Sequence, residues 1–330
     1  MRHQFLAAAL AAFALLAAVP NGQDTKALKG TVRIDGSSTV YPITEAAAEE
    51  FSKVAEKVNV TVGVSGTGGG FKRFGAGELD VADASRCIKK AELEAAKSRS
   101  IEFIELPVAF DGLTIVVNKG NTWVKQLTVA QVTKLYSAAD PAKTWKDVDP
   151  SWPAQTIKLY SPGTDSGTFD YFREVVVGKD GKIRADLSVS EDDNVLVKGV
   201  AGDVNAIGFF GFAYYMENKE QLACVPVVNP TTGAAVVPTH ETIEKATYAP
   251  FSRPLFIYVN KGALDKPQVR AFVDFYLANA AKLAEEVGYV KLPAALSDRA
   301  KANLAAGKTG TQMLDENGRE RSGALADLYK

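Results

Sequence analysis

Side chains that bind metals or carry redox chemistry are scarce in this sequence. The 330 residues include two cysteines and two histidines. His3 falls in an N-terminal segment that we expect to be removed, which leaves His240 alone, too little for an ordinary four-ligand zinc site. We therefore expect no metal and no cofactor. Cys87 and Cys224 can pair in an oxidising compartment or lie apart as small buried side chains, and the sequence leaves both alternatives open.

The sequence also lacks an excess of charge of either sign. Lys and Arg together number 38, Asp and Glu 39, and the formal net charge is -1 at pH 7. Because acids and bases are interspersed, neither a basic face for nucleic acid nor a polybasic segment for an anionic membrane is indicated. Any anion that this protein binds must be held locally.

Residues 1–20 have the pattern of a secretory signal peptide. Arg2 precedes an apolar run at residues 5–19, and Pro20 ends it. The run is too short to span a bilayer as a helix. No cysteine follows it directly, so a lipid anchor is not supported. We expect the mature protein to be exported, to the periplasm or beyond, and soluble.

Motifs of several enzyme classes are missing. Neither the Gly-x-x-x-x-Gly-Lys-Ser/Thr run of a nucleotide-binding loop nor the Rossmann glycine pattern is present. Ser166 lies in an Asp-Ser-Gly stretch that suggests a serine hydrolase, but no pattern brings His240 to it as a base. The clustered carboxylates and histidines of a metal-dependent phosphatase are not found. The sequence therefore favours a binding protein over an enzyme.

Strand and helix patterns alternate along the chain, which is typical of an α/β fold. Residues 31–40 and 58–70 begin as β-branched strands and run into loops of Gly, Ser and Thr. Between them, residues 44–57 have the apolar spacing of a helix, with Thr44 as its candidate cap. A longer amphipathic helix is expected within residues 266–288.

Two apolar segments, residues 112–120 and 254–262, both end in Val-Asn-Lys-Gly. They are either two buried strands with similar turns or the paired crossings between two lobes. The second alternative predicts a discontinuous first lobe at 28–111 plus 256–307, a second lobe at 112–255, and a polar C-terminal tail at 308–330 with no clear place in either.

Three loops of glycine and hydroxyl residues, at 35–42, 65–74 and 164–172, each follow a strand and precede a helix. One such loop alone can simply cap its own helix. In open α/β sheets, however, such loops gather at the carboxyl ends of the strands, where N–H groups at helix starts hold anions. Ser85 and Arg86 end a further strand. Arg86 is either an ordinary surface arginine or a ligand contact, since the forked N–H groups of its guanidinium suit a tetrahedral oxyanion. We expect an anion site in a cleft between the lobes.

Four motifs in this order resemble the phosphate-binding proteins of ABC-type phosphate uptake: DGSSTVYPITEAAAEEF, SGTGGGFKRFGAGELDVADASR, SPGTDSGTFDYF and DDNVLVKGVAGDVNAIGFFGFAYY. The similarity covers about residues 31–307. It implies a two-lobed periplasmic-binding-protein fold of type II, with two hinge strands and the ligand cleft between the lobes. It also implies capture of inorganic phosphate without turnover, and a membrane permease as the partner of a monomer.

The resemblance also implies site residues. The family's first phosphate loop falls on Ser38, Thr39 and Val40, Thr67 takes the place of a serine donor, and the third loop matches Ser166, Gly167 and Thr168. This sequence departs from some members, which have an aspartate at Ser85 and an arginine at Pro162. Arg86 is the expected replacement for that cation, and Asp165 for the acceptor. The predicted phosphate-binding residues are therefore Ser38, Thr39, Val40, Thr67, Ser85, Arg86, Asp165, Ser166, Gly167 and Thr168.

Phosphate near neutral pH carries a proton that sulfate lacks, so a buried carboxylate can accept a hydrogen bond from phosphate and repels sulfate. Asp165 is the first candidate for this role, with Asp83 and Asp111 next, although Asp165 can also be a plain helix cap. Two alternatives to a phosphate-binding protein stay open: a protein that binds another oxyanion, such as sulfate or molybdate, and an exported phosphoesterase.

Overall fold

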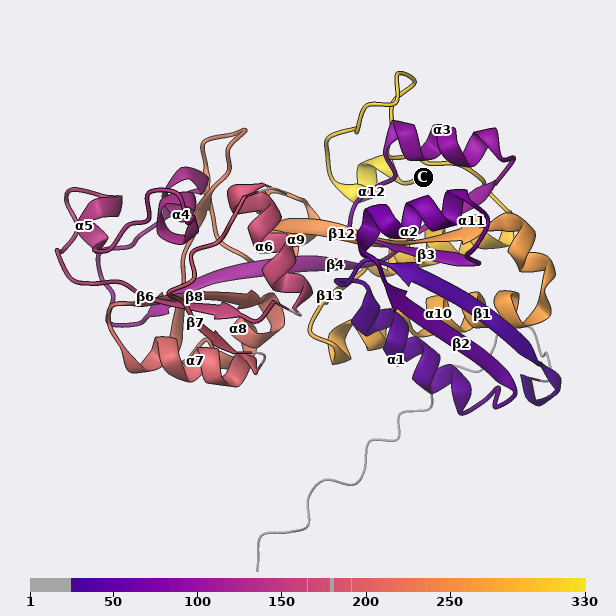
Figure 1. Ribbon diagram of the computed structural model, residues 1–330, viewed down its shortest axis with the longest axis horizontal. Coiled ribbons are helices and arrows are strands. Elements are labelled where there is room, and N and C mark those ends of the chain that lie inside the picture. The colour runs from indigo at the N-terminus through magenta and orange to yellow at the C-terminus, as the bar shows by residue number, and fades with distance from the viewer. Residues whose placement is uncertain (1–24, 165, 179–180, 191) are drawn as a thin grey trace, which may run out of the picture.

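The computed structural model describes residues 25–164, 166–178, 181–190 and 192–330, which form two lobes side by side (Figure 1). The strands of the main sheet are β1 (Gly30–Gly36), β2 (Val58–Val64), β3 (Val81–Ala84), β4 (Phe103–Asn118), β6 (Lys158–Pro162), β7 (Ser188–Ser190), β8 (Ala206–Gly211), β9 (Leu222–Cys224), β12 (Ser252–Asn260) and β13 (Val290–Lys291). They follow one another in the order β2-β1-β3-β12-β4-β8-β6-β7, with β13 and β9 also paired to β4. The two-lobed α/β fold expected from the sequence is confirmed.

The first lobe is built on the parallel strands β1, β2 and β3. Val32 and Ile34 of β1 are buried, and β1 pairs with β2 on one side and β3 on the other. Because the three strands run in the same direction, the loops after them meet at one edge of the sheet. The helices of this lobe are α1 (Tyr41–Ser52), α2 (Gly66–Gly75), α3 (Lys90–Ser98), α10 (Pro267–Glu286) and α11 (Ala294–Ala305).

The helix expected from Thr44 begins earlier. It starts at Tyr41, where Pro42 lies in the first turn, a position that suits the fixed backbone angle of proline. Thr44 is inside the helix and does not cap it, and its hydroxyl lies 3.0 Å from the Tyr276 hydroxyl. The helix ends at Ser52, short of the expected residue 57, and Val54 beyond it is 37% exposed.

Two strands, β4 and β12, connect the lobes. β4 is 16 residues long and buried along nearly all of its length. Its first part pairs antiparallel with β12, from Phe103 opposite Asn260 to Gly112 opposite Ser252. Its remainder, residues 113–117, pairs with β8 of the second lobe. One strand therefore belongs to both lobes, and β12 lies beside it.

The two Val-Asn-Lys-Gly segments lie on these two strands and share a local turn. The Gly120 N–H donates to Asn118 Oδ1 at 2.8 Å, and the Gly262 N–H donates to Asn260 Oδ1 at 3.0 Å. Asn118 ends β4 in the second lobe, whereas Asn260 ends β12 in the first. The sequence similarity thus reflects both the crossing strands and the same asparagine turn at their ends.

The second lobe packs helices on the strands β6, β7 and β8. Its helices are α4 (Val129–Tyr136), α5 (Trp145–Val148), α6 (Gly167–Val177), α7 (Asp193–Gly202), α8 (Phe212–Asn218) and α9 (His240–Glu244), and a small second sheet contains β5 (Leu127–Thr128), β10 (Val227–Val228) and β11 (Ala235–Val236). Phe172 of α6 stacks on Phe209 of β8 with ring centroids 3.7 Å apart, and Tyr136 of α4 packs edge-on against both rings. This aromatic contact fixes α6 on the sheet.

The C-terminal tail, residues 308–330, packs against the first lobe. The Gly310 N–H donates to the Phe103 carbonyl at 2.9 Å, and the Tyr329 hydroxyl donates to the Glu105 carbonyl at 2.9 Å. The tail contains the short helix α12 (Leu325–Leu328), and Met313 and Tyr329 are buried. This segment was not assigned to either lobe from the sequence because its few apolar side chains show neither helical nor strand periodicity. Two single-turn 3-10 helices, η1 (Thr25–Ala27) and η2 (Lys261–Asp265), complete the described elements.

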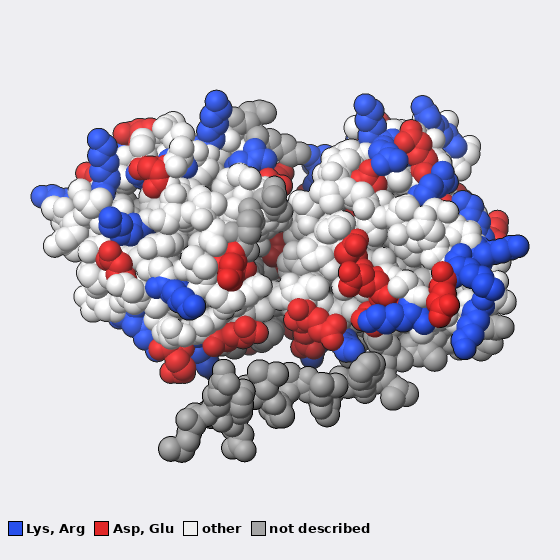
Figure 2. Space-filling view, turned by 60° about the horizontal axis from the view of Figure 1, so that its bottom comes forward, with Lys and Arg blue, Asp and Glu red and all other residues white. Residues whose placement is uncertain are grey.

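Charged side chains of both signs are interspersed over both lobes on the face shown in Figure 2. Within the described ranges, no helix has the length and apolar character that a membrane span requires. Cys87 and Cys224 are both free thiols, Cys87 buried and Cys224 partly so. Of the two alternatives for the cysteines, the structure has the unpaired one.

Candidate functional site

A cavity of about 250 Å³ lies where the two lobes meet. The first lobe contributes the ends of β1 and β3 and the start of α2, the second lobe contributes α6, and the crossing strand β12 contributes Arg253. Its lining residues are Ser37, Ser38, Thr39, Gly66, Thr67, Gly68, Ser85, Arg86, Asp170, Tyr171, Arg173, Glu174 and Arg253. Five of the predicted site residues are among them: Ser38, Thr39, Thr67, Ser85 and Arg86.

The loop after β1 brings an uncapped helix start to this cavity. Gly36 has a φ of 151°, and a Cβ there would lie 2.1 Å from the Asp83 carbonyl oxygen, so only glycine allows this turn. The Ser37 N–H then donates to that same carbonyl at 3.0 Å, and the Thr39 N–H donates to Ser37 Oγ at 3.2 Å. Val40 is the N-cap of α1 and offers no side-chain cap. Since its side chain is fully buried, only its backbone can contribute to a site.

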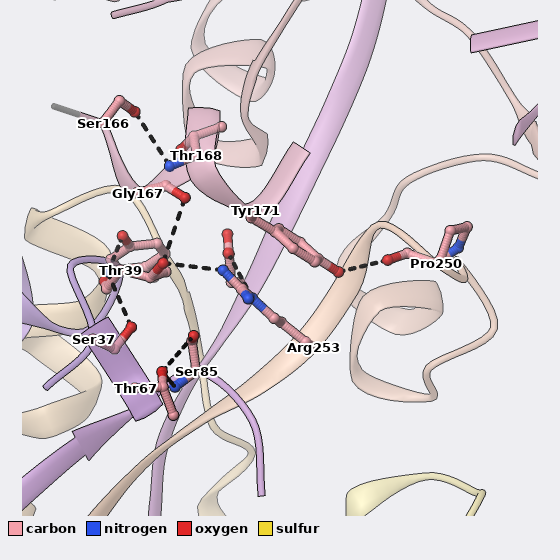
Figure 3. A network of polar contacts seen from close by, with 12 residues as sticks. Ser37, Thr39, Thr67, Ser85, Ser166, Gly167, Thr168, Tyr171, Pro250 and Arg253 are labelled. Atoms are coloured by element: carbon pink, nitrogen blue, oxygen red, sulfur yellow. Dashed lines mark hydrogen bonds and ion pairs between the residues drawn. The ribbon is translucent and has the colours of Figure 1, made fainter. Parts of the chain in front are cut away.

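The glycine-rich segment expected as a loop is the first turn of α2. The helix begins at Gly66, and Ser65 at its N-cap makes no side-chain cap bond. Thr67 Oγ1 lies 3.1 Å from Ser85 Oγ and accepts the Ser85 N–H at 3.2 Å, which joins this turn to the end of β3 (Figure 3). A Cβ on Gly70 would lie 2.7 Å from Gly36 Cα, so the helix can approach the first loop only with glycine there.

The start of α6 touches the first loop across the lobes. Thr39 Oγ1 donates to the Gly167 carbonyl at 3.4 Å, and a Cβ on Gly167 would lie 2.7 Å from Thr39 Cα. Ser166 Oγ accepts the Thr168 N–H at 3.2 Å and so caps its own helix. The predicted residues Ser166, Gly167 and Thr168 therefore lie beside Thr39 rather than in the lining of the cavity. Asp165 lies outside the described residues.

Arg253 is the residue that the sequence analysis missed. Its Nη2 donates to Thr39 Oγ1 at 3.0 Å, its Nε to Asp111 Oδ2 at 3.3 Å, and its guanidinium carbon lies 3.6 Å from the centroid of the Tyr171 ring (Figure 3). The Tyr171 hydroxyl is held in turn by the Pro250 carbonyl at 2.6 Å. Among the described residues Nη1 has no hydrogen-bond partner, so it can serve a ligand. Its place on a strand far along the chain from all three loops gave no local signal.

Arg86 lines the cavity, but its fork is already occupied. Its Nη1 and Nη2 donate to the two carboxylate oxygens of Glu92 at 2.9 and 2.8 Å, and Nη1 also donates to the Cys87 carbonyl at 3.0 Å. Glu92 neutralises much of the positive charge that the sequence analysis assigned to the ligand. Arg253 is the better placed of the two cations, although it too has a carboxylate partner.

The carboxylates near the site fall into two groups. Asp170 and Glu174 of α6 line the cavity, and Ser38 Oγ lies 3.5 Å from Asp170 Oδ2. Asp83 and Asp111, which the sequence analysis considered as proton acceptors, are fully buried and outside the lining. Burial raises the pKa of Asp83 to about 8 against an opposing contact from Thr44. Burial also raises the pKa of Asp111, and Arg253 opposes that shift.

The described residues contain no group of three or more His, Cys, Asp or Glu side chains able to hold a metal ion. His240 is not in the lining of the cavity, and its ring packs edge-on against Phe212 with centroids 5.0 Å apart. What the site offers is helix starts, hydroxyl groups and a guanidinium. These are donors for an anion.

Residues 21–280 match the family model described as a PBP superfamily domain. The chain belongs to this superfamily. It is 51% identical over 310 residues to the protein SphX of Synechococcus elongatus, an alignment that covers 93% of this chain and 90% of SphX. It is 43% identical to the phosphate-binding protein PstS of Staphylococcus saprophyticus, over 86% of this chain and 88% of PstS. This member of the superfamily therefore aligns with both along nearly their whole length.

A solved structure supports the same assignment. The crystal structure of a possible phosphate-binding protein from Planctomyces limnophilus superimposes with a TM-score of 0.83 and 43% sequence identity. The match covers 86% of this chain and all of the other. The similarity to the phosphate-binding family, drawn above from four motifs, is confirmed.

Proposed function

We propose that this protein captures inorganic phosphate in the cleft between its lobes and delivers it to the permease of an ABC transporter. The observation that carries the proposal is the convergence of the starts of α1 and α2 and of the Arg253 guanidinium on one cavity between the lobes. The names of the PstS relative and of the Planctomyces limnophilus structure support phosphate as the ligand.

The chemistry of the donors suits a phosphate that has lost its water. Each oxygen needs hydrogen-bond donors, and N–H groups at helix starts together with hydroxyl groups supply them without a large positive charge. Ser38 and Thr67 provide hydroxyls, and Arg253 provides Nη1 from a position fixed by Tyr171. The Thr39 hydroxyl becomes a donor to the ligand once closure breaks its bond to the Gly167 carbonyl. Closure of the lobes would exclude water and strengthen each of these bonds.

We assign phosphate contacts to Arg253 as well as to the residues predicted from the sequence. The backbone of Val40 belongs to the proposal because it lies at the start of α1. Residues 165–168 belong to it because lobe closure can bring α6 further over Thr39, which it already touches. Ser85 acts through its bond to Thr67, and Arg86 contributes a charge shared with Glu92.

Asp170 and Glu174 suggest how phosphate is distinguished from sulfate. A carboxylate in the cavity can accept the proton of a phosphate and can only repel sulfate, which has none. Asp170, beside Ser38 and 3.5 Å from the Arg173 guanidinium, is the better placed of the two. Because its side chain is 48% exposed, this role requires lobe closure to bury it. This arrangement favours phosphate over the sulfate and molybdate alternatives.

Binding without turnover is the function that we propose. Hydrolysis of a phosphate ester needs a base or a metal to activate the nucleophile. His240, the only histidine among the described residues, packs against Phe212 outside the cavity lining. We further propose that the protein is exported and works as a monomer, with lobes at 28–111 plus 256–307 and 112–255 and the tail at 308–330.

Isothermal titration of the mature protein tests the proposal. Phosphate should bind with measurable heat, and sulfate at equal concentration should bind more weakly or not at all. Turnover of a chromogenic phosphate ester should not be detected. Absence of heat with phosphate, or hydrolysis of the ester, would contradict the proposed function.

A further inference from the structure

The carboxylate of Asp35 joins two of the loops that form the anion site. Asp35 lies on β1 two residues before Ser37, which lines the cavity, and it is 3% exposed. Its Oδ1 accepts the Ser65 N–H at 2.9 Å. Ser65 is the N-cap of α2, so this bond fixes the start of the helix, and Gly66 and Thr67 follow it in the lining of the cavity.

The position of Asp35 brings a negative charge close to a site for an anion. A Cβ on Gly63 would lie 3.0 Å from Asp35 Cγ, and a Cβ on Gly70 would lie 2.9 Å from the Asp35 carbonyl oxygen. The two glycines therefore let β2 and α2 pack directly on Asp35. A carboxylate that is enclosed in this way repels a bound anion more strongly than it would in water, because the effective dielectric constant around it is lower.

Arg73 supplies the opposite charge. Its Nη1 forms an ion pair with Asp35 Oδ2, and it lies in the last turn of α2, so the helix whose start Asp35 fixes also carries the cation that pairs with Asp35. Arg73 Nε also donates to Glu78 Oε2 at 3.1 Å, but the Glu78 side chain is 55% exposed and water screens that pair. Arg73 is outside the lining of the cavity, so it acts on a ligand through Asp35.

We propose that Arg73 is a positioning residue of the phosphate site, which neutralises Asp35 and holds its carboxylate on the Ser65 N–H. This inference rests on the proposed function, since it concerns how the same site tolerates a phosphate beside a carboxylate. Without Arg73, the Asp35 carboxylate would keep its bond to Ser65 and repel the phosphate. Asp83, a second buried acid near Asp35, has a pKa raised to about 8 by burial, so at pH 7 it adds little charge for Arg73 to neutralise.

Titration calorimetry with inorganic phosphate at pH 7 tests the role of this charge. Arg73→Met removes the guanidinium but keeps an unbranched side chain, and we expect phosphate affinity to fall by about tenfold or more. Arg73→Lys keeps the positive charge and should stay within about threefold of the parent. Glu78→Gln is the matched control, because it removes the other partner of Arg73 and leaves Asp35 paired; it should change affinity by less than about twofold.

A double variant, Arg73→Met with Asp35→Asn, separates repulsion from a loss of packing. The asparagine carbonyl oxygen can still accept the Ser65 N–H but carries no charge, so affinity should recover to within about threefold of the parent. If Arg73 only supported the fold, the double variant would bind as weakly as Arg73→Met or more weakly. Urea unfolding of every variant at the same pH shows which of them are folded.

The outcomes keep the two proposals apart. If the parent binds phosphate and a folded Arg73→Met protein binds it within about twofold of the parent, the inference is overturned and the proposed function stands. A double variant as weak as Arg73→Met also overturns the inference. If Arg73→Met does not fold, the double variant decides, and a loss of about tenfold or more in it overturns the inference. If the parent itself binds no phosphate, the proposed function fails and the inference fails with it.

Discussion

Replacing Arg253 with alanine should remove most of the phosphate affinity. The side chain is 15% exposed and is held by Thr39, Asp111 and the Tyr171 ring, so its Nη1 is positioned before a ligand arrives. One hydrogen bond to a charged group contributes about 1.5 to 3 kcal/mol, and loss of the guanidinium removes one or two of them. We expect a loss of about 2 to 4 kcal/mol, which is a factor of roughly 30 to 700 in the dissociation constant.

The same change should also lower stability, because it leaves Asp111 without its cation. Asp111 is 1% exposed, and removal of one partner from a buried pair costs about 3 to 5 kcal/mol. Burial raises the pKa of Asp111, so in the variant the carboxyl group can take up a proton instead. The folded state then binds a proton that the unfolded state has released, and the stability of the variant should fall as pH rises above about 4.

Two further variants separate binding from stability. The double variant Arg253→Ala with Asp111→Asn should regain stability but not phosphate affinity. Arg253→Lys should regain only part of the affinity, since an ammonium group cannot contact Asp111, Thr39 and the ligand at once as the planar guanidinium can. Titration calorimetry measures the affinity, and urea unfolding at pH 5 and pH 8 measures the stability. A folded Arg253→Ala protein that binds phosphate within about twofold of the parent would refute the assignment.

Four other substitutions test neighbouring groups. Arg86→Ala should weaken phosphate binding less than Arg253→Ala does, because Glu92 already neutralises Arg86; an equal or larger loss by calorimetry would return the main role to Arg86. Asp170→Asn should lower phosphate affinity and raise sulfate affinity, and parallel changes in the two would remove Asp170 as the proton acceptor. The raised pKa of Asp83, about 8, means that between about pH 4 and pH 8 the folded state holds a proton that the unfolded state does not, so parent stability should fall with rising pH by up to about 1.4 kcal/mol per unit. Asp83→Asn should flatten this slope in urea unfolding, and an unchanged slope would show that Asp83 ionises normally. Glu105→Gln should lower stability by about 1 to 3 kcal/mol, because it weakens the hydrogen bonds that the buried carboxylate accepts from Thr311 and Gln312 of the tail, and leave phosphate affinity unchanged; a stable variant would mean that the tail is held otherwise.

Local sequence patterns were enough to predict the fold class and the loops that the first lobe contributes to the site. The alternation of β-branched residues in a strand and the helical spacing of apolar residues are patterns among near neighbours in the chain. They predicted β1, β2 and the helix between them. The loops at 35–42 and 65–74 were predicted because glycine and hydroxyl residues at a strand end are a signal within ten residues, whereas the choice of Ser38, Thr39 and Thr67 within them came from the resemblance to the phosphate-binding family. The boundaries were less certain: α1 starts at Tyr41, because a proline in the first turn outweighed the capping signal of Thr44.

Only the tertiary structure decided which charges face the ligand and where the tail lies. Arg253 reaches the cavity because the antiparallel register of β12 with β4 places it opposite Asp111, a pairing across 142 residues that no local pattern encodes. Arg86 looked like a free cation in the sequence, yet one turn of α3 brings the Glu92 carboxylate to its fork. The tail has too few apolar residues to show a period, and its place depends on several contacts with β4, among them the bond of Gly310 to the Phe103 carbonyl and that of Thr311 to the buried Glu105 carboxylate. Signals that act within one helix or strand can be read from the sequence, whereas ion pairs and hydrogen bonds between distant segments exist only after the lobes have folded.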